Sequence, residues 1–192
     1  WPNVIAGIEE VKTGNIGKVH FAKGWYTNGR KSIGTGNVVP VPEWLDWELW
    51  QGPAPREEYR DNIIHYNWHW FRNWGGGEFL NNGMHFIDLL RWGLGVDYPT
   101  HVDSIGGRYY YEDDYEFPDT QMVTYQFGRD ASMWMESRSC NAGPVEGLYS
   151  GVGFYGEKGN LFIHGGDVYK IRNHKGKIIK EIKSSLQFED GN

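Results

Sequence analysis

Polar side chains that could carry out acid-base chemistry recur at helical spacing within residues 74–92. Three glycines open this stretch, and one face of the apolar run that follows carries Asn81, His85, Asp88 and Trp92. The other faces are apolar, which predicts a helix from about Glu78 to Gly93 that is buried nearly all round. Burying an amide, an imidazole and a carboxylate is unfavourable unless each finds a partner. This face must therefore meet a hydrogen-bonding core network or a cleft.

Two interpretations of His85 and Asp88 stay open. In the first, both are satisfied core residues that join the helix to a sheet. In the second they line a chemical site, which is favoured by the three glycines at positions 75–77. Glycine permits positive φ and lets a ligand approach the N-terminus of a helix closely, although glycines also form ordinary turns.

The composition excludes several classes of protein. A chain of 192 residues can bury one good core but hardly two complete α/β domains, so we expect a single domain. A net charge of -6 and a pI near 5.6 argue against a nucleic-acid surface. No window approaches the roughly 18 apolar residues of a membrane span. The single Cys140 excludes an internal disulfide and leaves the cellular compartment undetermined.

Six of the ten tryptophans lie between Trp44 and Trp74, in a segment that also contains prolines and charged residues. Such a segment suits the binding of sugars, because C–H faces stack on rings and hydroxyls take hydrogen bonds from side chains. The alternative is that a long loop simply packs onto the sheet.

The order of the elements predicts an α+β fold. A helical pattern ends at Gly14-Asn15, and residues 18–26 read as a strand. After Pro99, runs rich in β-branched and aromatic residues predict strands at 102–111, 121–127, 132–138, 148–155, 160–164, 168–172 and 177–182. Hairpin-type turns at 128–130, 156–159 and 173–176 make this sheet mostly antiparallel.

Several motifs are absent from the sequence. It contains no G-x-G-x-x-G after a strand, no P-loop and no H-E-x-x-H, so we do not expect a nucleotide site complete within this chain. His65 and His69 have the spacing of metal ligands on a helix but lack a clear third ligand, and we predict no metal site. The G-x-S-x-G signal of serine hydrolases is missing, and spacing alone selects no carboxylate pair for glycoside hydrolysis.

Three segments occur in a familiar order: Gly14-Asn-Ile-Gly-Lys-Val19, Trp47-Glu-Leu-Trp-Gln-Gly-Pro-Ala-Pro55, and Gly75-Gly-Gly followed by Asn81-x-x-x-His85-x-x-Asp88. Together they resemble the C-terminal domain of the Gfo/Idh/MocA oxidoreductases, the glucose-fructose oxidoreductase and inositol dehydrogenase family. The resemblance covers nearly the whole chain. It implies a large, mainly antiparallel open sheet with helices on one face, as in the C-terminal domain of glyceraldehyde-3-phosphate dehydrogenase. The other face is commonly used for oligomerisation, which implies a homo-oligomer.

The resemblance also implies a division of labour between domains. Residues 1–14 would end the helix that leads from a dinucleotide-binding domain missing from this sequence, and residues 15–192 would form the substrate-binding and oligomerisation domain. NAD or NADP would be bound mainly by the missing domain, which in this family also supplies a catalytic lysine. No cofactor-binding residue is assigned within this chain.

The family's helix motif usually reads Asp-x-x-x-His, with the histidine as the acid/base at the substrate hydroxyl. His85 matches that histidine, whereas Asn81 occupies the aspartate position. An amide still orients the imidazole but brings no charge, which favours neutral histidine. A neutral imidazole remains a competent base near pH 7. The resemblance also implies, through a less specific match than the helix motif, that the sugar-binding residues are Trp68, His69, Trp70, Arg72 and Asn82.

Three functional hypotheses follow. The first is the substrate-binding half of an NAD(P)-dependent oxidoreductase that acts on a CH–OH group of a sugar or polyol. The second is a family member that uses NAD to cleave a glycosidic bond with no net redox change. The third is a non-catalytic saccharide-binding or assembly module, which the amide of Asn81 makes plausible.

Overall fold

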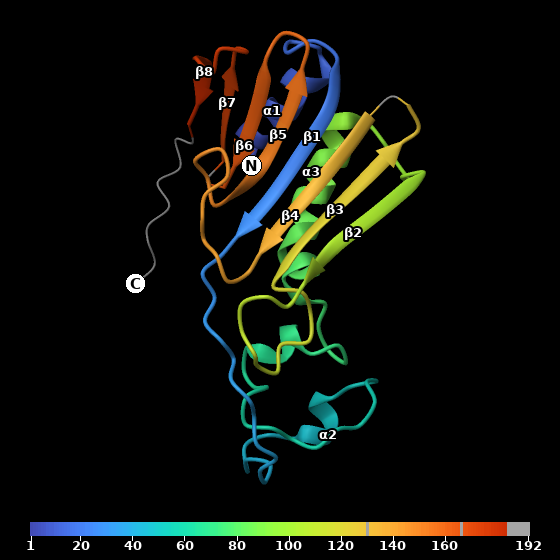
Figure 1. Cartoon of the computed structure of the whole chain (residues 1–192), viewed down its shortest axis with the longest axis vertical. Helices are drawn as coiled ribbons and strands as arrows, with labels where there is room; N and C mark the ends of the chain where they lie inside the picture. The colour runs from blue at the N-terminus through green and yellow to red at the C-terminus, as the bar shows by residue number, and fades with distance from the viewer. Residues whose placement is uncertain (130, 166, 184–192) are drawn as a thin grey trace.

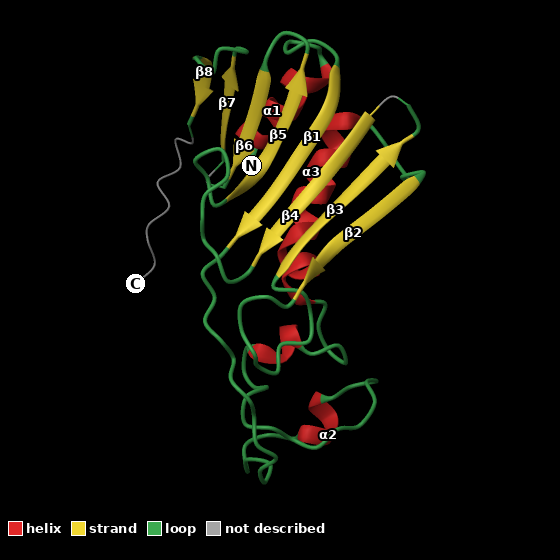
Figure 2. Ribbon diagram, in the orientation of Figure 1, coloured by secondary structure: helices red, strands yellow, loops and turns green. Residues whose placement is uncertain are grey.

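The computed structural model describes residues 1–129, 131–165 and 167–183. Its helices are α1 (Pro2–Lys12), α2 (Trp47–Trp50), a 3-10 helix (Asn67–Trp70), a π-helical turn (Phe79–Gly83) and α3 (Met84–Leu94). Its strands are β1 (Val19–Thr27), β2 (His101–Gly107), β3 (Thr120–Phe127), β4 (Ala131–Arg138), β5 (Ser150–Gly156), β6 (Asn160–His164), β7 (Val168–Arg172) and β8 (Ile178–Ile182). Figure 2 shows these elements by type.

The strands form one eight-stranded open sheet in the order β2-β3-β4-β1-β5-β6-β7-β8 (Figure 1). β1 lies in the middle, parallel to β4, and the other described neighbours are antiparallel. The predicted α+β fold with a mainly antiparallel open sheet is therefore confirmed. Residue 130 of the predicted turn 128–130 and residues 184–192 of the predicted domain lie outside the described residues.

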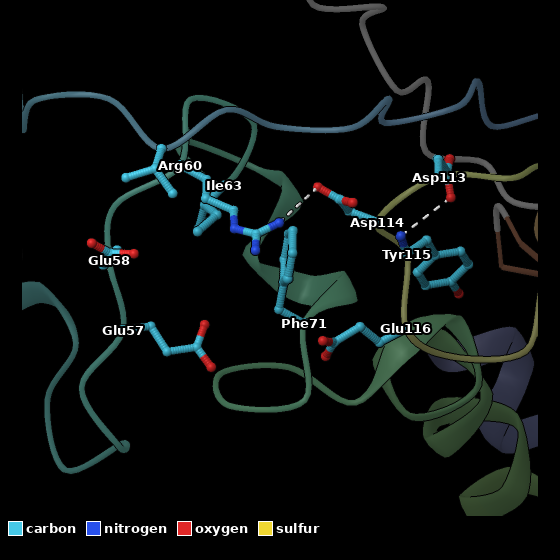
Figure 3. Close-up of a pocket in the computed structure, with 10 residues that line it drawn as sticks. Glu57, Glu58, Arg60, Ile63, Phe71, Asp113, Asp114, Tyr115 and Glu116 are labelled. Atoms are coloured by element: carbon cyan, nitrogen blue, oxygen red, sulfur yellow. Dashed lines mark hydrogen bonds and ion pairs between the residues drawn. The ribbon is translucent and has the colours of Figure 1, made fainter.

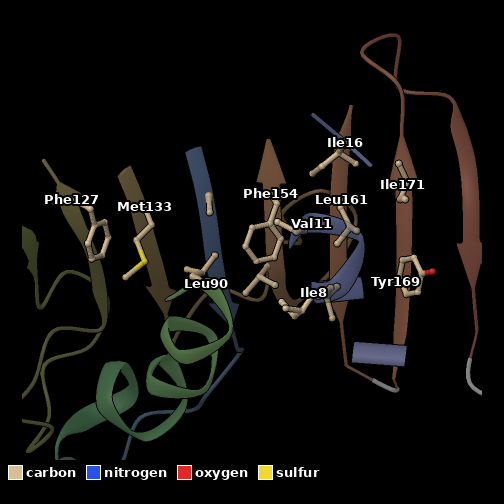
Figure 4. Packing of buried hydrophobic residues seen from close by; sticks show 13 residues of the cluster. Ile8, Val11, Ile16, Leu90, Phe127, Met133, Phe154, Leu161, Tyr169 and Ile171 are labelled. Atoms are coloured by element: carbon tan, nitrogen blue, oxygen red, sulfur yellow. The ribbon is translucent and has the colours of Figure 1, made fainter. Parts of the chain in front are cut away.

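The main core lies between the sheet and the two long helices, which both pack on one face of it (Figures 1 and 4). Ile8 of α1, Leu90 of α3, and Phe154 and Leu161 of the sheet are completely buried there. α3 approaches the sheet closely at Gly93, where an added Cβ would lie 2.3 Å from the Phe154 ring. This close packing buries one side of α3 against the sheet.

Two sequence predictions need correction. The predicted helix 78–93 is not buried nearly all round: Leu80 of the π-helical turn is 59% exposed and Met84 of α3 is 57% exposed, because the sheet covers only the opposite side of the helix. The predicted strand 102–111 ends at Gly107. Beyond it, the backbone N–H groups of Tyr109 and Tyr110 donate to the buried carboxylate of Asp119 instead of continuing the ladder.

The tryptophan-rich segment forms an aromatic lobe, residues 37–74, at the lower end of the molecule in Figure 1. Its own core contains Trp47, Tyr59, Ile63 and Phe71. The segment thus packs mostly on itself rather than onto the sheet, contrary to one of the two interpretations above. Among the described helices, none has the length and hydrophobicity needed to cross a bilayer.

A buried carboxylate ties residues 108–116 to the loop after β1. Asp113 accepts hydrogen bonds from the Ser32 hydroxyl (2.7 Å) and the Ile33 N–H (2.9 Å), and it forms an ion pair with Arg108. Burial on its own raises the pKa of Asp113, but these hydrogen bonds and the Arg108 charge outweigh burial and leave the pKa below its ordinary value.

A pH dependence of stability follows from this carboxylate. Because the folded pKa is lowered, the stabilisation is complete above the ordinary aspartate pKa of about 3.9 and is lost as the pH falls through the folded value. We expect the urea midpoint to fall as the pH drops below about 4, and the Asp113→Asn variant to show a smaller fall. Equal acid sensitivity of the variant and the wild type would contradict this role.

Candidate functional site

His85 lies in the first turn of α3, exposed, on the wall of a hollow of about 820 Å³. We call this the His85 hollow. It is bordered by α3, the start of α1 and the ends of β5 and β6, and most of its lining is apolar, including Val4, Phe86 and Ile163. Asp88 is also exposed and lines it. In the described chain these two polar residues therefore face a cleft, and the interpretation as satisfied core residues is wrong.

Asn81 precedes His85 by four residues, in the π-helical turn, and is half-buried. The part of the chain that the structure describes contains no hydrogen bond between the two side chains. The orienting role of Asn81 thus stays a prediction.

A buried ion pair lies at the start of the same helix. Glu78 is 1% exposed, and its carboxylate accepts hydrogen bonds from both Nε and Nη2 of Arg30. Asn82 donates its amide to the same carboxylate, and the Glu78 N–H donates to the Tyr115 hydroxyl at 3.1 Å. The two-point geometry suits guanidinium, whose donors match the oxygens of a carboxylate.

Aromatic rings cover the guanidinium of this pair. The Arg30 Cζ lies 4.8 Å from the centre of the Trp70 ring and 5.6 Å from that of Tyr66. Desolvation on its own lowers the pKa of Arg30, but the paired Glu78 outweighs it and raises the pKa above its ordinary value. The Arg30 guanidinium therefore stays charged, and the pair anchors the start of the helix to the loop after β1.

The three glycines before the helix are explained by contacts within the chain. A Cβ on Gly75 would lie 2.2 Å from the His69 carbonyl oxygen, so the backbones touch there. Gly77 has φ +68, a left-handed conformation that glycine adopts easily, and packs against Phe117. Gly75 thus lets the start of the helix lie directly against the aromatic lobe, and Gly77 lets the chain turn beside Phe117.

The predicted sugar-binding residues fall into separate places. Trp70 and Asn82 belong to the Arg30–Glu78 cluster, and Trp70 is only 3% exposed. His69 stacks on Trp68 at 3.7 Å, and its Nδ1 lies 2.6 Å from the Tyr66 carbonyl oxygen. Arg72 bonds to Glu116 through its own backbone N–H and through Nη2. None of the predicted five is among the described residues that line the His85 hollow.

A second hollow, of about 510 Å³, is rich in carboxylates (Figure 3). Asp114 pairs with Arg60 at 3.5 Å and accepts the Gly36 N–H and the Asn62 amide. The Asp113 and Glu116 carboxylates are likewise bound by groups of the chain itself. These three carboxylates hold loops together. Within the described ranges, no group of three or more potential ligands is arranged for a metal ion.

Sequence reasoning missed Arg30 and Glu78. Glu78 stands directly after the glycines, at the predicted start of an apolar helix, and a carboxylate there needs a cationic partner if buried. That signal could have singled out Glu78. No local pattern indicates Arg30, which lies 48 residues away along the chain.

The open sheet with both long helices on one face defines the class of the fold, an α+β domain. Residues 36–190 match the family model described as "Oxidoreductase family, C-terminal alpha/beta domain". The chain therefore belongs to the Gfo/Idh/MocA oxidoreductase family, as the sequence motifs predicted. No curated protein sequence matches it significantly.

Solved structures with the same fold include an NAD binding oxidoreductase from Klebsiella pneumoniae, with 14% identity and a TM-score of 0.62 over 96% of this chain and 44% of that chain. Levoglucosan dehydrogenase in complex with NADH and levoglucosan has 14% identity and a TM-score of 0.61 over 95% and 44%. A super-repressor mutant of Gal80p from Saccharomyces cerevisiae has 12% identity and a TM-score of 0.61 over 97% and 45%. The chain thus spans less than half the length of these proteins.

Proposed function

We propose that this chain is the substrate-binding and oligomerisation half of an NAD(P)-dependent oxidoreductase acting on a CH–OH group of a sugar or polyol. The observation that carries the proposal is His85, an exposed histidine on the wall of the largely apolar His85 hollow. Family membership supports oxidoreductase chemistry. The levoglucosan dehydrogenase of the same fold supports a carbohydrate substrate.

In the proposed reaction, the His85 imidazole accepts the hydroxyl proton of the substrate while the hydrogen on the same carbon leaves as hydride, so that a carbonyl forms. NAD or NADP, when bound, supplies the hydride acceptor. The apolar wall would exclude water and strengthen the interaction of the imidazole with the reacting hydroxyl. Asn81, one turn earlier, would orient the ring.

The hollow fits a substrate better than a dinucleotide. Among the described residues that line it, Arg91 is the one arginine or lysine, and its Nε donates to the Asp97 carbonyl oxygen at 2.9 Å. A pyrophosphate normally sits on a glycine-rich helix N-terminus, a motif that this sequence lacks. In our proposal the cofactor is therefore held mainly by a domain beyond this chain, and residues 1–14 form the end of the connecting helix.

Cofactor titration tests the proposal. The coding sequence upstream of Trp1 is read, and the whole protein is titrated with NADH and NADPH while a panel of sugars and polyols is assayed for reduced cofactor. We expect an upstream dinucleotide-binding motif, saturable binding of one cofactor, and turnover of a carbohydrate. An intact whole protein that binds neither cofactor would refute the proposal.

A non-catalytic saccharide-binding or assembly module is the second candidate. It is favoured by Asn81, which replaces the charged residue usual in the family, and by the Gal80p super-repressor of the same fold. It predicts carbohydrate binding without cofactor-dependent turnover.

We also propose that the sheet face opposite the helices forms a homo-oligomer. Ile105 and Met122 pair across β2 and β3 on the face opposite the helices and are 66% and 36% exposed. Burying such side chains against a second copy is favourable. Light scattering should give at least a dimer, and Ile105→Lys should shift it toward monomer, whereas Val102→Lys, on the helix side of the same strand, should not. A monomeric wild type at high concentration would contradict this.

A further inference from the structure

The aromatic lobe contains a hollow of about 590 Å³ whose lining includes Trp50, Trp68 and Trp74. We call it the tryptophan pocket. Its volume is in the range of small-molecule sites. It shares no described lining residue with the His85 hollow. The catalytic proposal therefore does not use it.

The walls of this pocket are held in place by the core of the lobe. Trp50 stacks on the buried Trp47 with ring centres 4.9 Å apart, and Trp74 meets Trp50 edge-on at 5.3 Å. The Trp47 indole N–H donates to the Glu57 carbonyl oxygen at 2.7 Å, which fixes the ring behind Trp50. Rings packed in this way offer apolar surface at little further cost in conformational entropy.

Polar groups in the walls are left with unused hydrogen-bonding capacity. Gln51 is 3% exposed, and its Oε1 accepts the Glu57 N–H at 2.7 Å, so the amide nitrogen remains a donor without an acceptor among the described residues. The Trp74 indole nitrogen is also buried without an acceptor there. Asn73 gives its amide nitrogen to Glu57 and keeps its Oδ1 as a free acceptor. A buried polar group normally finds a partner, so the Trp74 indole nitrogen, the one of these three groups that is fully buried without one in the described chain, indicates a ligand.

We propose that the tryptophan pocket binds a neutral saccharide unit at a site separate from the His85 hollow. Its lining contains no charged residue, unlike the acidic hollow, so a neutral ligand fits it best. A pyranose ring offers C–H faces for the indoles and hydroxyls that both accept from Gln51 and donate to Asn73. A proline-rich peptide would also stack on the rings, but prolines lack N–H donors and would leave Asn73 unpaired.

Site-resolved binding tests this proposal. The whole protein, labelled with 15N at the tryptophan indoles, is titrated with D-glucose, D-galactose, myo-inositol and cellobiose, and the indole signals are assigned with Trp→Phe variants. We expect millimolar binding that shifts the signals of Trp50, Trp68 and Trp74 but leaves that of Trp92, on α3, unchanged. The shifts should persist in a His85→Ala background, so this result is independent of the catalytic proposal.

Two variants sharpen the test. Gln51→Glu keeps the oxygen that accepts the Glu57 N–H but removes the free donor, and Trp50→Ala removes a stacking face. Each should weaken binding by about tenfold or more, whereas Trp44→Ala, an exposed tryptophan of the same lobe outside the pocket, should not. Thermal melting checks that each variant folds. The proposal is overturned if no sugar shifts the three signals, or if a polyproline peptide shifts them and the sugars do not.

Discussion

The His85→Ala variant of the whole protein should turn over its carbohydrate substrate about 100-fold or more slowly than the wild type. A positioned general base contributes at least this factor, and an alanine can neither accept nor return the hydroxyl proton. The fall should appear in both kcat and kcat/KM, because the proton moves in the transition state. Steady-state kinetics with the identified sugar and cofactor measure it.

The control for this prediction is His20→Ala, the same change at another exposed histidine, on β1 and outside the His85 hollow. His85 is itself exposed, so both variants should unfold at nearly the wild-type temperature. A loss of activity in His85→Ala would then not result from unfolding. Wild-type turnover in a folded His85→Ala variant would contradict the proposed acid/base role of His85.

The largest loss of stability should follow from removing Arg30. In the Arg30→Met variant the carboxylate of Glu78, only 1% exposed, loses its cation but keeps its burial. Leaving a buried charge without its partner costs about 3–5 kcal/mol. Glu78→Gln should cost less, about 1–2 kcal/mol, because the Arg30 side chain is 21% exposed and water can reach it. Urea unfolding followed by tryptophan fluorescence measures both.

The double variant Arg30→Met/Glu78→Gln distinguishes an ion pair from simple packing. If the pair carries the effect, the double variant should be more stable than Arg30→Met alone, because the unpartnered charge has gone. Costs that simply add would show that the ion pair contributes little, and that the packing of Arg30 on Trp70 explains its effect.

Local patterns in the sequence were enough to predict the type of fold. Alternating apolar residues and turn residues act between neighbours, so strands such as 160–164 and 168–172 were predicted at the residues where β6 and β7 occur. The helical spacing of 78–93 likewise predicted α3 and placed Asn81 and His85 together. The family motifs then connected this helix with acid-base chemistry.

The tertiary structure decided what depends on distant partners. β1 lies between β4 and β5, more than 100 residues later, and no local pattern specifies that parallel pairing. The packing of such segments also determines three features of the site. It forms the Arg30–Glu78 pair, leaves His85 exposed, and separates Trp68 from the His85 hollow. Hydrophobic periodicity tells which faces of an element are apolar but not which surface covers each of them, as the exposed Leu80 and Met84 show. The sequence by itself therefore determined the elements and the candidate base, and the packing of distant segments determined the site around that base.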